Sequence, residues 1–155
     1  MESNGTSTIS RLAVMLLAGF VALTVTVSAG GAPASAARTK SLHVTKECSE
    51  YTGAAGSFCT ITSSNFRRIP VGTRVYYDQA ANVPAGLLDS NVVLDAGDGN
   101  RALGRCTLDL MTGLGLCTFA DGIGNLAGFH ARVAVDCTAE CRWDGPYGFA
   151  DLDKD

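Results

Sequence analysis

The chain contains six cysteines, a residue type that can form disulfides, bind metal ions or act as a catalytic thiol. Two pairs are each separated by eleven positions and bracket stretches that contain glycine, and the last two cysteines are four positions apart. Two strands joined by a tight turn place such positions opposite each other, ~4.5–5.5 Å apart at Cα, which a disulfide can bridge. Among the fifteen pairings that six cysteines allow, this spacing favours three local ones. The predicted disulfides are Cys48–Cys59, Cys106–Cys117 and Cys137–Cys141.

Metal binding and thiol catalysis are the alternatives for these cysteines. Zinc sites usually contain Cys-x-x-Cys pairs, and the chain has none. Neither His43 nor His130 stands at ligand spacing from a cysteine pair, and three local disulfides leave no free thiol. Residues 95–100 weakly resemble a calcium loop but lack its closing glutamate, so they predict a hairpin turn. The sequence therefore predicts no metal and no cofactor, and it carries no nucleophile elbow for a Ser–His–Asp hydrolase.

Ligand binding is the other chemistry that the residue types allow. Tyr76 and Tyr77 are adjacent, so in a strand they point to opposite faces, and one of them is expected inside. A tyrosine presents a large apolar body and a polar tip, which suits a small-molecule pocket. The alternative is an ordinary core or edge aromatic residue. Asn65 is a further candidate, with a local turn contact as its simpler role.

His130 and Arg132 are the remaining candidates, on an alternating stretch from Phe129 to Cys137. Every second residue there is apolar, and His130, Arg132 and Asp136 occupy the opposite face. If the apolar stripe is the core, these polar side chains are solvated, which is the ordinary arrangement and the one that we favour. If the stripe instead faces outward, a homo-oligomer would cover it and the polar residues would line the interior.

The elements that would position these residues are short strands. Alternation, β-branched residues and glycine turns indicate strands through residues 42–149, whereas Pro84 and Gly86 interrupt the best helix candidate, 80–88. Seven or eight short strands separated by glycine turns are typical of a sandwich or a closed barrel. The predicted strands lie at 42–45, 58–62, 73–77, 91–94, 101–109, 114–119, 129–137 and 142–149.

The first 36 residues differ from the rest of the chain. A polar start with Arg11 is followed by the apolar stretch Leu12–Val27 and by small residues up to Ala36, which is the order of a secretory signal peptide. A retained membrane anchor is the alternative, but this stretch makes roughly 24 Å of helix, less than a ~30 Å hydrocarbon core. The sequence thus predicts a secreted protein, cleaved after Ala36 or after Ala29, with no membrane association afterwards.

Residues 37–155 are predicted to form one domain with its core at 42–149. The net charge of the chain is −3, and Arg67-Arg68 is the one basic pair after the leader. Nucleic-acid binding requires a clustered basic face, so the composition argues against that class of partner. Six cysteines in an exported chain indicate an oxidising compartment.

A glycine-rich segment gives the chain a family resemblance. Residues 112–115 (TGLG) lead into FADGIGNLAGF at 119–129 and then into an alternating strand. This resembles the glycine-rich segment of the allene oxide cyclase and dirigent barrels, and the order of segments from Pro70–Thr73 onward is similar as well. The resemblance covers residues 42–149 and implies an eight-stranded antiparallel barrel with an interior cavity, often in oligomers. It implies either a cyclase that uses a glutamate and a bound water, or a protein that orients reactive phenolic intermediates.

Three functions follow from the sequence. The first is a secreted barrel that binds or orients a small, mostly apolar molecule, because no complete catalytic group of residues is present. The second is an isomerase or cyclase of the allene oxide cyclase type, although Glu47 and Glu50 flank a predicted turn and do not match that family's catalytic positions. The third is an extracellular interaction or inhibitor module that docks through rigid loops such as 111–113.

Overall fold

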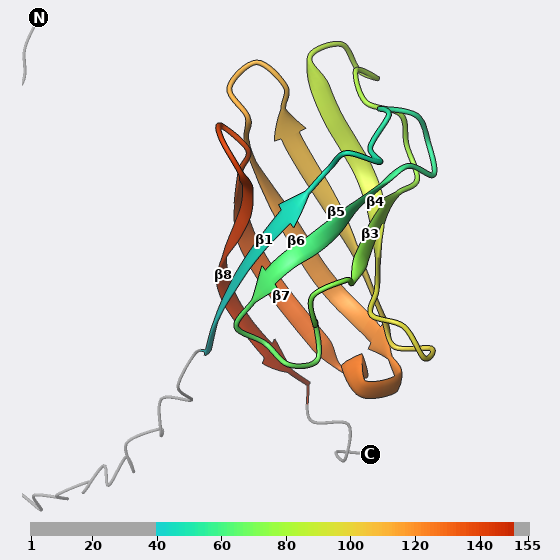
Figure 1. Cartoon of the computed structure of the whole chain (residues 1–155), viewed down its shortest axis with the longest axis vertical. Coiled ribbons are helices and arrows are strands. Elements are labelled where there is room, and N and C mark those ends of the chain that lie inside the picture. The colour runs from blue at the N-terminus through green and yellow to red at the C-terminus, as the bar shows by residue number, and fades with distance from the viewer. Residues whose placement is uncertain (1–39, 151–155) are drawn as a thin grey trace, which may run out of the picture. The chain divides into compact units, whose positions relative to one another are not determined.

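The computed structural model describes residues 40–150, which form a closed antiparallel β-barrel of eight strands (Figure 1). The predicted signal peptide, 1–36, and the last residues, 151–155, lie outside the described residues. The strands are β1 (Lys40–Glu47), β2 (Phe58–Ser64), β3 (Arg74–Tyr77), β4 (Leu87–Asp95), β5 (Arg101–Asp109), β6 (Leu114–Ile123), β7 (Phe129–Asp136) and β8 (Cys141–Phe149). The prediction of an all-β, disulfide-stapled barrel of about eight strands is confirmed.

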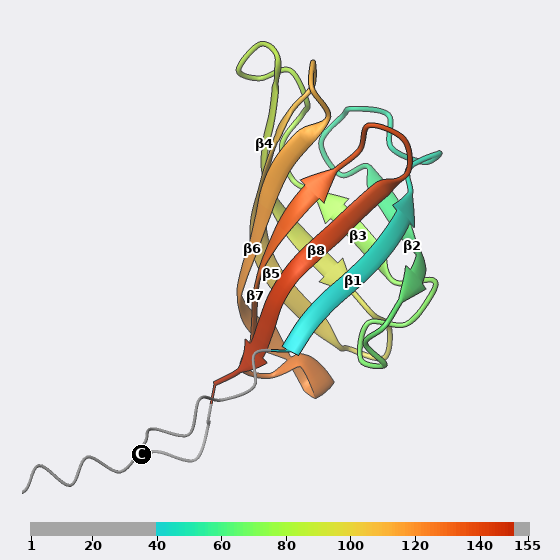
Figure 2. The same cartoon turned by 90° about the vertical axis from the view of Figure 1, so that its left-hand side faces the viewer.

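The strands follow one another around the barrel in chain order. Each pairs with the next, and β8 pairs with β1 to close the sheet. Figure 2 shows this closure, with β1 lying between β8 and β2. Because a closed sheet has no free edge, every strand finds two hydrogen-bonding neighbours. The interior of an eight-stranded barrel is just wide enough for the inward side chains or for one small ligand.

Turn residues explain why neighbouring strands pair. Between β4 and β5, residues Gly97, Asp98 and Gly99 all have positive φ, a backbone conformation that glycine adopts at little cost. This is the turn that the sequence predicts at 95–100. Strand β4 is longer than the predicted 91–94, because the inward positions already alternate from Leu88 onward, directly after the loop that contains Pro84.

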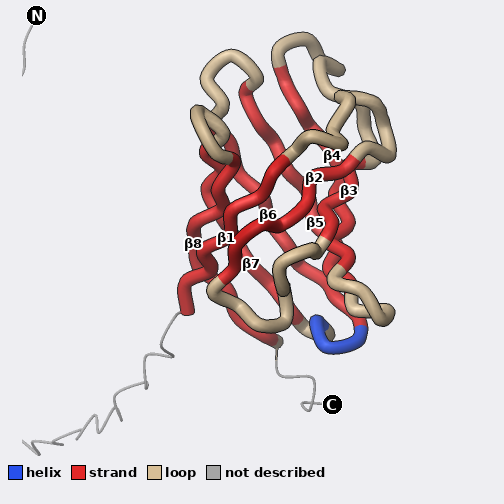
Figure 3. The backbone as a smooth tube through the Cα atoms, viewed as in Figure 1, coloured by secondary structure: helices blue, strands red, loops and turns tan. Residues whose placement is uncertain are grey.

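Helical structure within residues 40–150 is confined to one 3₁₀ turn, η1 (Gly124–Leu126), between β6 and β7. No helix in this part of the chain is long and apolar enough to cross a membrane. Figure 3 shows η1 at the end of the barrel where β1 starts and β8 finishes. Its Leu126 is fully buried, so the turn closes that end over the core.

The barrel interior is apolar and is divided into an aromatic end and a disulfide end. On β7 the predicted apolar stripe, from Phe129 to Val135, faces inward. Phe129 lies at the centre of the aromatic end, near η1. The centroid of its ring lies about 6 Å from the centroids of four other aromatic rings. Those four rings belong to Phe66, Phe119, Tyr147 and Phe149.

The three predicted disulfides all form. Their Cα–Cα distances are 4.2 Å for Cys48–Cys59, 4.1 Å for Cys106–Cys117 and 4.0 Å for Cys137–Cys141. Cys106 and Cys117 face each other directly in the β5–β6 pair, and each of the other two bridges closes the connection between consecutive strands. The described residues contain no free cysteine. Such bridges are expected in an oxidising environment.

We expect replacement of both Cys106 and Cys117 by alanine to lower the free energy of unfolding by about 2–4 kcal/mol. Both sulfurs are buried, and the bridge closes a loop of eleven positions. Replacing Cys137 and Cys141 is the matched control, because that bridge closes only four positions and is more exposed. Urea unfolding of both variants measures the difference. Equal losses would contradict the assignment of the larger effect to the buried bridge.

Candidate functional site

Lys46 is a lysine inside the apolar barrel. On β1 the inward positions are Leu42, Val44 and Lys46, so the alternation that buries two apolar residues buries the lysine as well. Only 5% of Lys46 is exposed. A buried charge is normally paired with an opposite one, because transfer of an ion out of water is costly. None of the ion pairs found within residues 40–150 includes Lys46.

The polar contact of Lys46 is with a tyrosine on β3. Its Nζ lies 2.5 Å from Tyr77 Oη and donates a hydrogen bond to it. The same nitrogen lies 4.8 Å from the ring centroid of Trp143 and 5.3 Å from that of Tyr77. Tyr51, from the loop between β1 and β2, packs edge-on against Tyr77 with 5.0 Å between ring centroids. Two aromatic rings therefore lie against the lysine near the disulfide end, and a third, that of Tyr51, packs against one of them.

Burial changes the acid–base behaviour of this group. Loss of hydration lowers the pKa of Lys46 from 10.5 to about 7. The pKa of Tyr77 is raised by burial and, to a smaller extent, by the neighbouring Tyr51. Near neutral pH a large share of the Lys46 amines is consequently uncharged, beside a hydroxyl that keeps its proton. An uncharged amine can accept a proton or act as a nucleophile.

Two further polar groups at this end have no protein partner. The Tyr51 hydroxyl and the Trp143 indole N–H are buried, and neither makes a hydrogen bond within residues 40–150. Ser90, by contrast, is also fully buried, and its hydroxyl both donates to Asn91 O and accepts from Gln79 N. Buried donors are usually satisfied. The Lys46 end of the interior thus has N–H and O–H donors that no acceptor among residues 40–150 satisfies.

A surface hollow of about 420 Å³ borders Lys46. Its size is within the range of small-molecule pockets. Glu47 and Glu140 are among its lining residues. Hydrogen bonds from the side chain and backbone of Ser49 lower the pKa of Glu47, which keeps it ionised. The residues that line the hollow are Thr45, Lys46, Glu47, Cys48, Thr62, Ala139, Glu140 and Cys141. A molecule seated there would lie against the strand that carries the buried amine.

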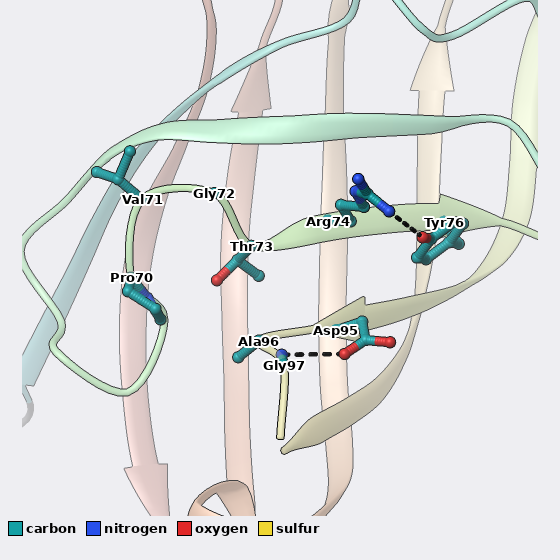
Figure 4. A pocket seen from close by; sticks show the side chains of 9 residues that line it. All are labelled: Pro70, Val71, Gly72, Thr73, Arg74, Tyr76, Asp95, Ala96 and Gly97. Atoms are coloured by element: carbon teal, nitrogen blue, oxygen red, sulfur yellow. Dashed lines mark hydrogen bonds between the residues drawn. The ribbon is translucent and has the colours of Figure 1, made fainter. Parts of the chain in front are cut away.

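A second hollow, of about 370 Å³, lies at the other end of β3 and contains Tyr76 (Figure 4). Arg74 Nη1 donates to Tyr76 Oη over 3.3 Å, and Asp95 accepts from the backbone N–H of Gly97 over 3.0 Å. Asp95 is also paired with Arg101 at 3.2 Å. The charged groups of this hollow already have protein partners, so it offers less to a ligand than the Lys46 end.

The structure places the five predicted ligand-binding residues in different regions. Tyr77 faces inward and meets Lys46, whereas Tyr76 faces the hollow of Figure 4. His130 and Arg132 lie on the outer face of β7, along a shallow hollow of about 240 Å³. Asn65 ties β1 to β2: its side chain accepts from His43 N and donates to Ser41 O. Only Tyr77 therefore belongs to the Lys46 site.

Sequence analysis missed Lys46, Tyr51 and Trp143. A signal for Lys46 was present, because counting every second residue from Leu42 through Val44 reaches it. The predicted strand, 42–45, ends one residue before Lys46. Trp143 carries no comparable signal, since its contact with Lys46 depends on closure of the barrel, and Tyr51 joins the site through its contact with Tyr77.

Comparison of the chain with protein-family models, curated proteins and solved structures finds no match. Within residues 40–150, no group of three or more histidine, cysteine, aspartate or glutamate side chains is arranged to hold a metal ion.

Proposed function

We propose that this protein binds a small, neutral, mostly apolar molecule through an acceptor oxygen at the Lys46 end of the barrel. The observation that carries the proposal is a buried lysine without an acidic partner among the described residues. An apolar side chain at position 46 would give a more stable barrel, because it removes the cost of burying an amine. Strongly perturbed ionisable groups of this kind concentrate at functional sites.

The surrounding groups define which ligand fits. The spare donors of Tyr51 and Trp143, together with Lys46, suit a carbonyl or hydroxyl oxygen. The aromatic rings suit an apolar body. Glu47 and Glu140 in the bordering hollow repel a carboxylate, and this favours a neutral ligand over an anionic one.

We extend the proposal to the family and the location of the protein. A closed eight-stranded barrel and a glycine-rich segment ahead of β7 support membership of the allene oxide cyclase-like and dirigent-like barrels. Three disulfides support secretion. Isomerase or cyclase activity stays a prediction, and so do a homo-oligomer and an interaction module. The last of these has the 89% exposed Met111 of the β5–β6 turn as its support.

The single tryptophan of the chain makes the binding proposal measurable. Trp143 lies under Lys46, so its fluorescence reports on a ligand at the amine. We expect medium-chain ketones and alcohols to change this fluorescence saturably, and the matched carboxylates to bind at least about tenfold more weakly. Lys46→Met should abolish the response, whereas Lys40→Met, on the exposed start of the same strand, should retain it. Fluorescence that stays unchanged with every ketone and alcohol would refute the proposal.

A further inference from the structure

We propose that the amine of Lys46 forms a reversible imine with an aldehyde or a ketone, and that Tyr77 transfers the proton that the reaction requires. This inference rests on the proposed binding function, and it narrows the ligand class to carbonyl compounds. It also gives the buried lysine a chemical role beyond hydrogen bonding.

The surroundings of Lys46 favour the form of the amine that attacks a carbonyl. The amine must be uncharged to attack, and the described residues provide no carboxylate partner that would hold its proton. Burial favours the uncharged form, as the lowered pKa of Lys46 reflects. Trp143 and Tyr77 cover the amine with aromatic rings, and limited access of water slows hydrolysis of an imine. A hydroxyl lies within 2.5 Å of the reacting nitrogen.

The reaction balances without an oxidant or a further reactant. The lone pair of Nζ attacks the carbonyl carbon, and the π electrons of the C=O bond move to oxygen. Tyr77 donates its proton to that oxygen and takes one from nitrogen, which gives a neutral carbinolamine. The C–O bond then breaks, its oxygen leaves as water with a second proton relayed from nitrogen through Tyr77, and the nitrogen lone pair forms C=N. Both amine hydrogens end on the water.

The titratable groups around Lys46 determine the pH range in which its amine can form the imine. Tyr77 on β3 and Tyr51 on the loop after β1 keep their protons near neutral pH, and Trp143 on β8 does not titrate. Glu47 and Glu140 are the carboxylates of the bordering hollow. An ordinary lysine has a pKa of about 10.4 and is almost fully charged at pH 7. At pH 7 the reaction should therefore select Lys46 over the other two lysines of the chain, Lys40 and Lys154.

Reductive trapping tests this inference on the unmodified full-length mature protein. We expect benzaldehyde with sodium cyanoborohydride at pH 7 to place a benzyl group on Lys46 at least about tenfold faster than on Lys40 or Lys154, as peptide mass spectrometry would show. Tyr77→Phe should slow trapping at Lys46 at least about tenfold, because the proton-transfer group is lost. Lys40→Met is the matched control outside the site, and it should leave unchanged both the trapping at Lys46 and the binding of benzyl alcohol, which cannot form an imine.

The outcomes separate the two proposals. Equal labelling of the three lysines, or none on Lys46, would overturn the imine while a saturable Trp143 response to benzyl alcohol would leave the binding function standing. If the fluorescence of Trp143 responds to neither benzaldehyde nor benzyl alcohol, the proposed binding function is refuted as well. Labelling of Lys46 that Tyr77→Phe leaves unchanged would reject the role of Tyr77.

Discussion

Lys46→Met should raise the free energy of unfolding by about 2–4 kcal/mol at pH 6. A pKa lowered from 10.5 to about 7 corresponds to about 5 kcal/mol of penalty for the charged lysine in the folded barrel. Methionine has a similar length and no charge, so the substitution removes that penalty. It also leaves the Tyr77 hydroxyl without its partner, at a cost of about 1–3 kcal/mol. The net effect remains stabilising.

The pH dependence of the free energy of unfolding tests the same cost of burying Lys46. Between pH 7 and about 10 the unfolded chain carries the Lys46 proton and the folded chain does not, so stability rises with pH. Below pH 7 both states carry the proton and the full penalty applies. Above about pH 10 the raised pKa of Tyr77 acts in the opposite direction, because the unfolded tyrosine ionises first.

Urea unfolding at pH 6 and pH 9 measures both effects. Because of the Lys46 amine, the wild type should be more stable at pH 9 than at pH 6. In Lys46→Met most of this difference in stability should be absent. Lys40→Met is the control for removal of a lysine from the exposed start of β1, and it should change neither value by more than about 0.5 kcal/mol. A Lys46→Met barrel that is less stable than the wild type at pH 6 would disprove the assigned cost.

Phe129→Ala should have the largest destabilising effect, about 3–5 kcal/mol. The ring is fully buried and is surrounded by four other aromatic rings at the end of the barrel that η1 closes. Its removal opens a cavity that neighbouring strands cannot fill, since the closed sheet restrains their movement. Thermal and urea unfolding should both show the loss.

Met111→Ala is the control for this substitution, because Met111 is 89% exposed on the β5–β6 turn. It should change stability by less than about 0.5 kcal/mol. A small effect of Phe129→Ala, comparable with that of Met111→Ala, would mean that the aromatic end does not hold the barrel together.

The expected effects of Lys46→Met and Phe129→Ala assign function and stability to opposite ends of the barrel interior. The aromatic end around Phe129 contributes packing, and Lys46, the buried charged residue among residues 40–150, lies at the other end. The disulfide end holds Lys46, Tyr51 and Trp143, whose polar groups are not fully satisfied. Three disulfides on or near that end offset part of the cost of such a site. A more stable Lys46→Met barrel that no longer binds ligands would display this trade-off directly.

Sequence reasoning succeeded where structure depends on nearby residues. The paired spacing of the cysteines predicted all three bridges, because each closes the connection between consecutive strands. The alternation from Phe129 to Val135 predicted a strand with one apolar face, and β7 has that face buried. The first predicted strand, 42–45, is shorter than β1, which continues through Lys46 and Glu47.

The sequence by itself determined the strands, their turns and their bridges, since backbone conformation and hairpin pairing act over a few residues. Only the tertiary structure decided which polar residues meet. Lys46 stands 31 positions from Tyr77 and much farther from Trp143. The three come together because β8 returns to pair with β1, which directs side chains from β1, β3 and β8 into one interior. The low pKa of Lys46 arises from that burial, a property of the closed barrel that no local segment carries.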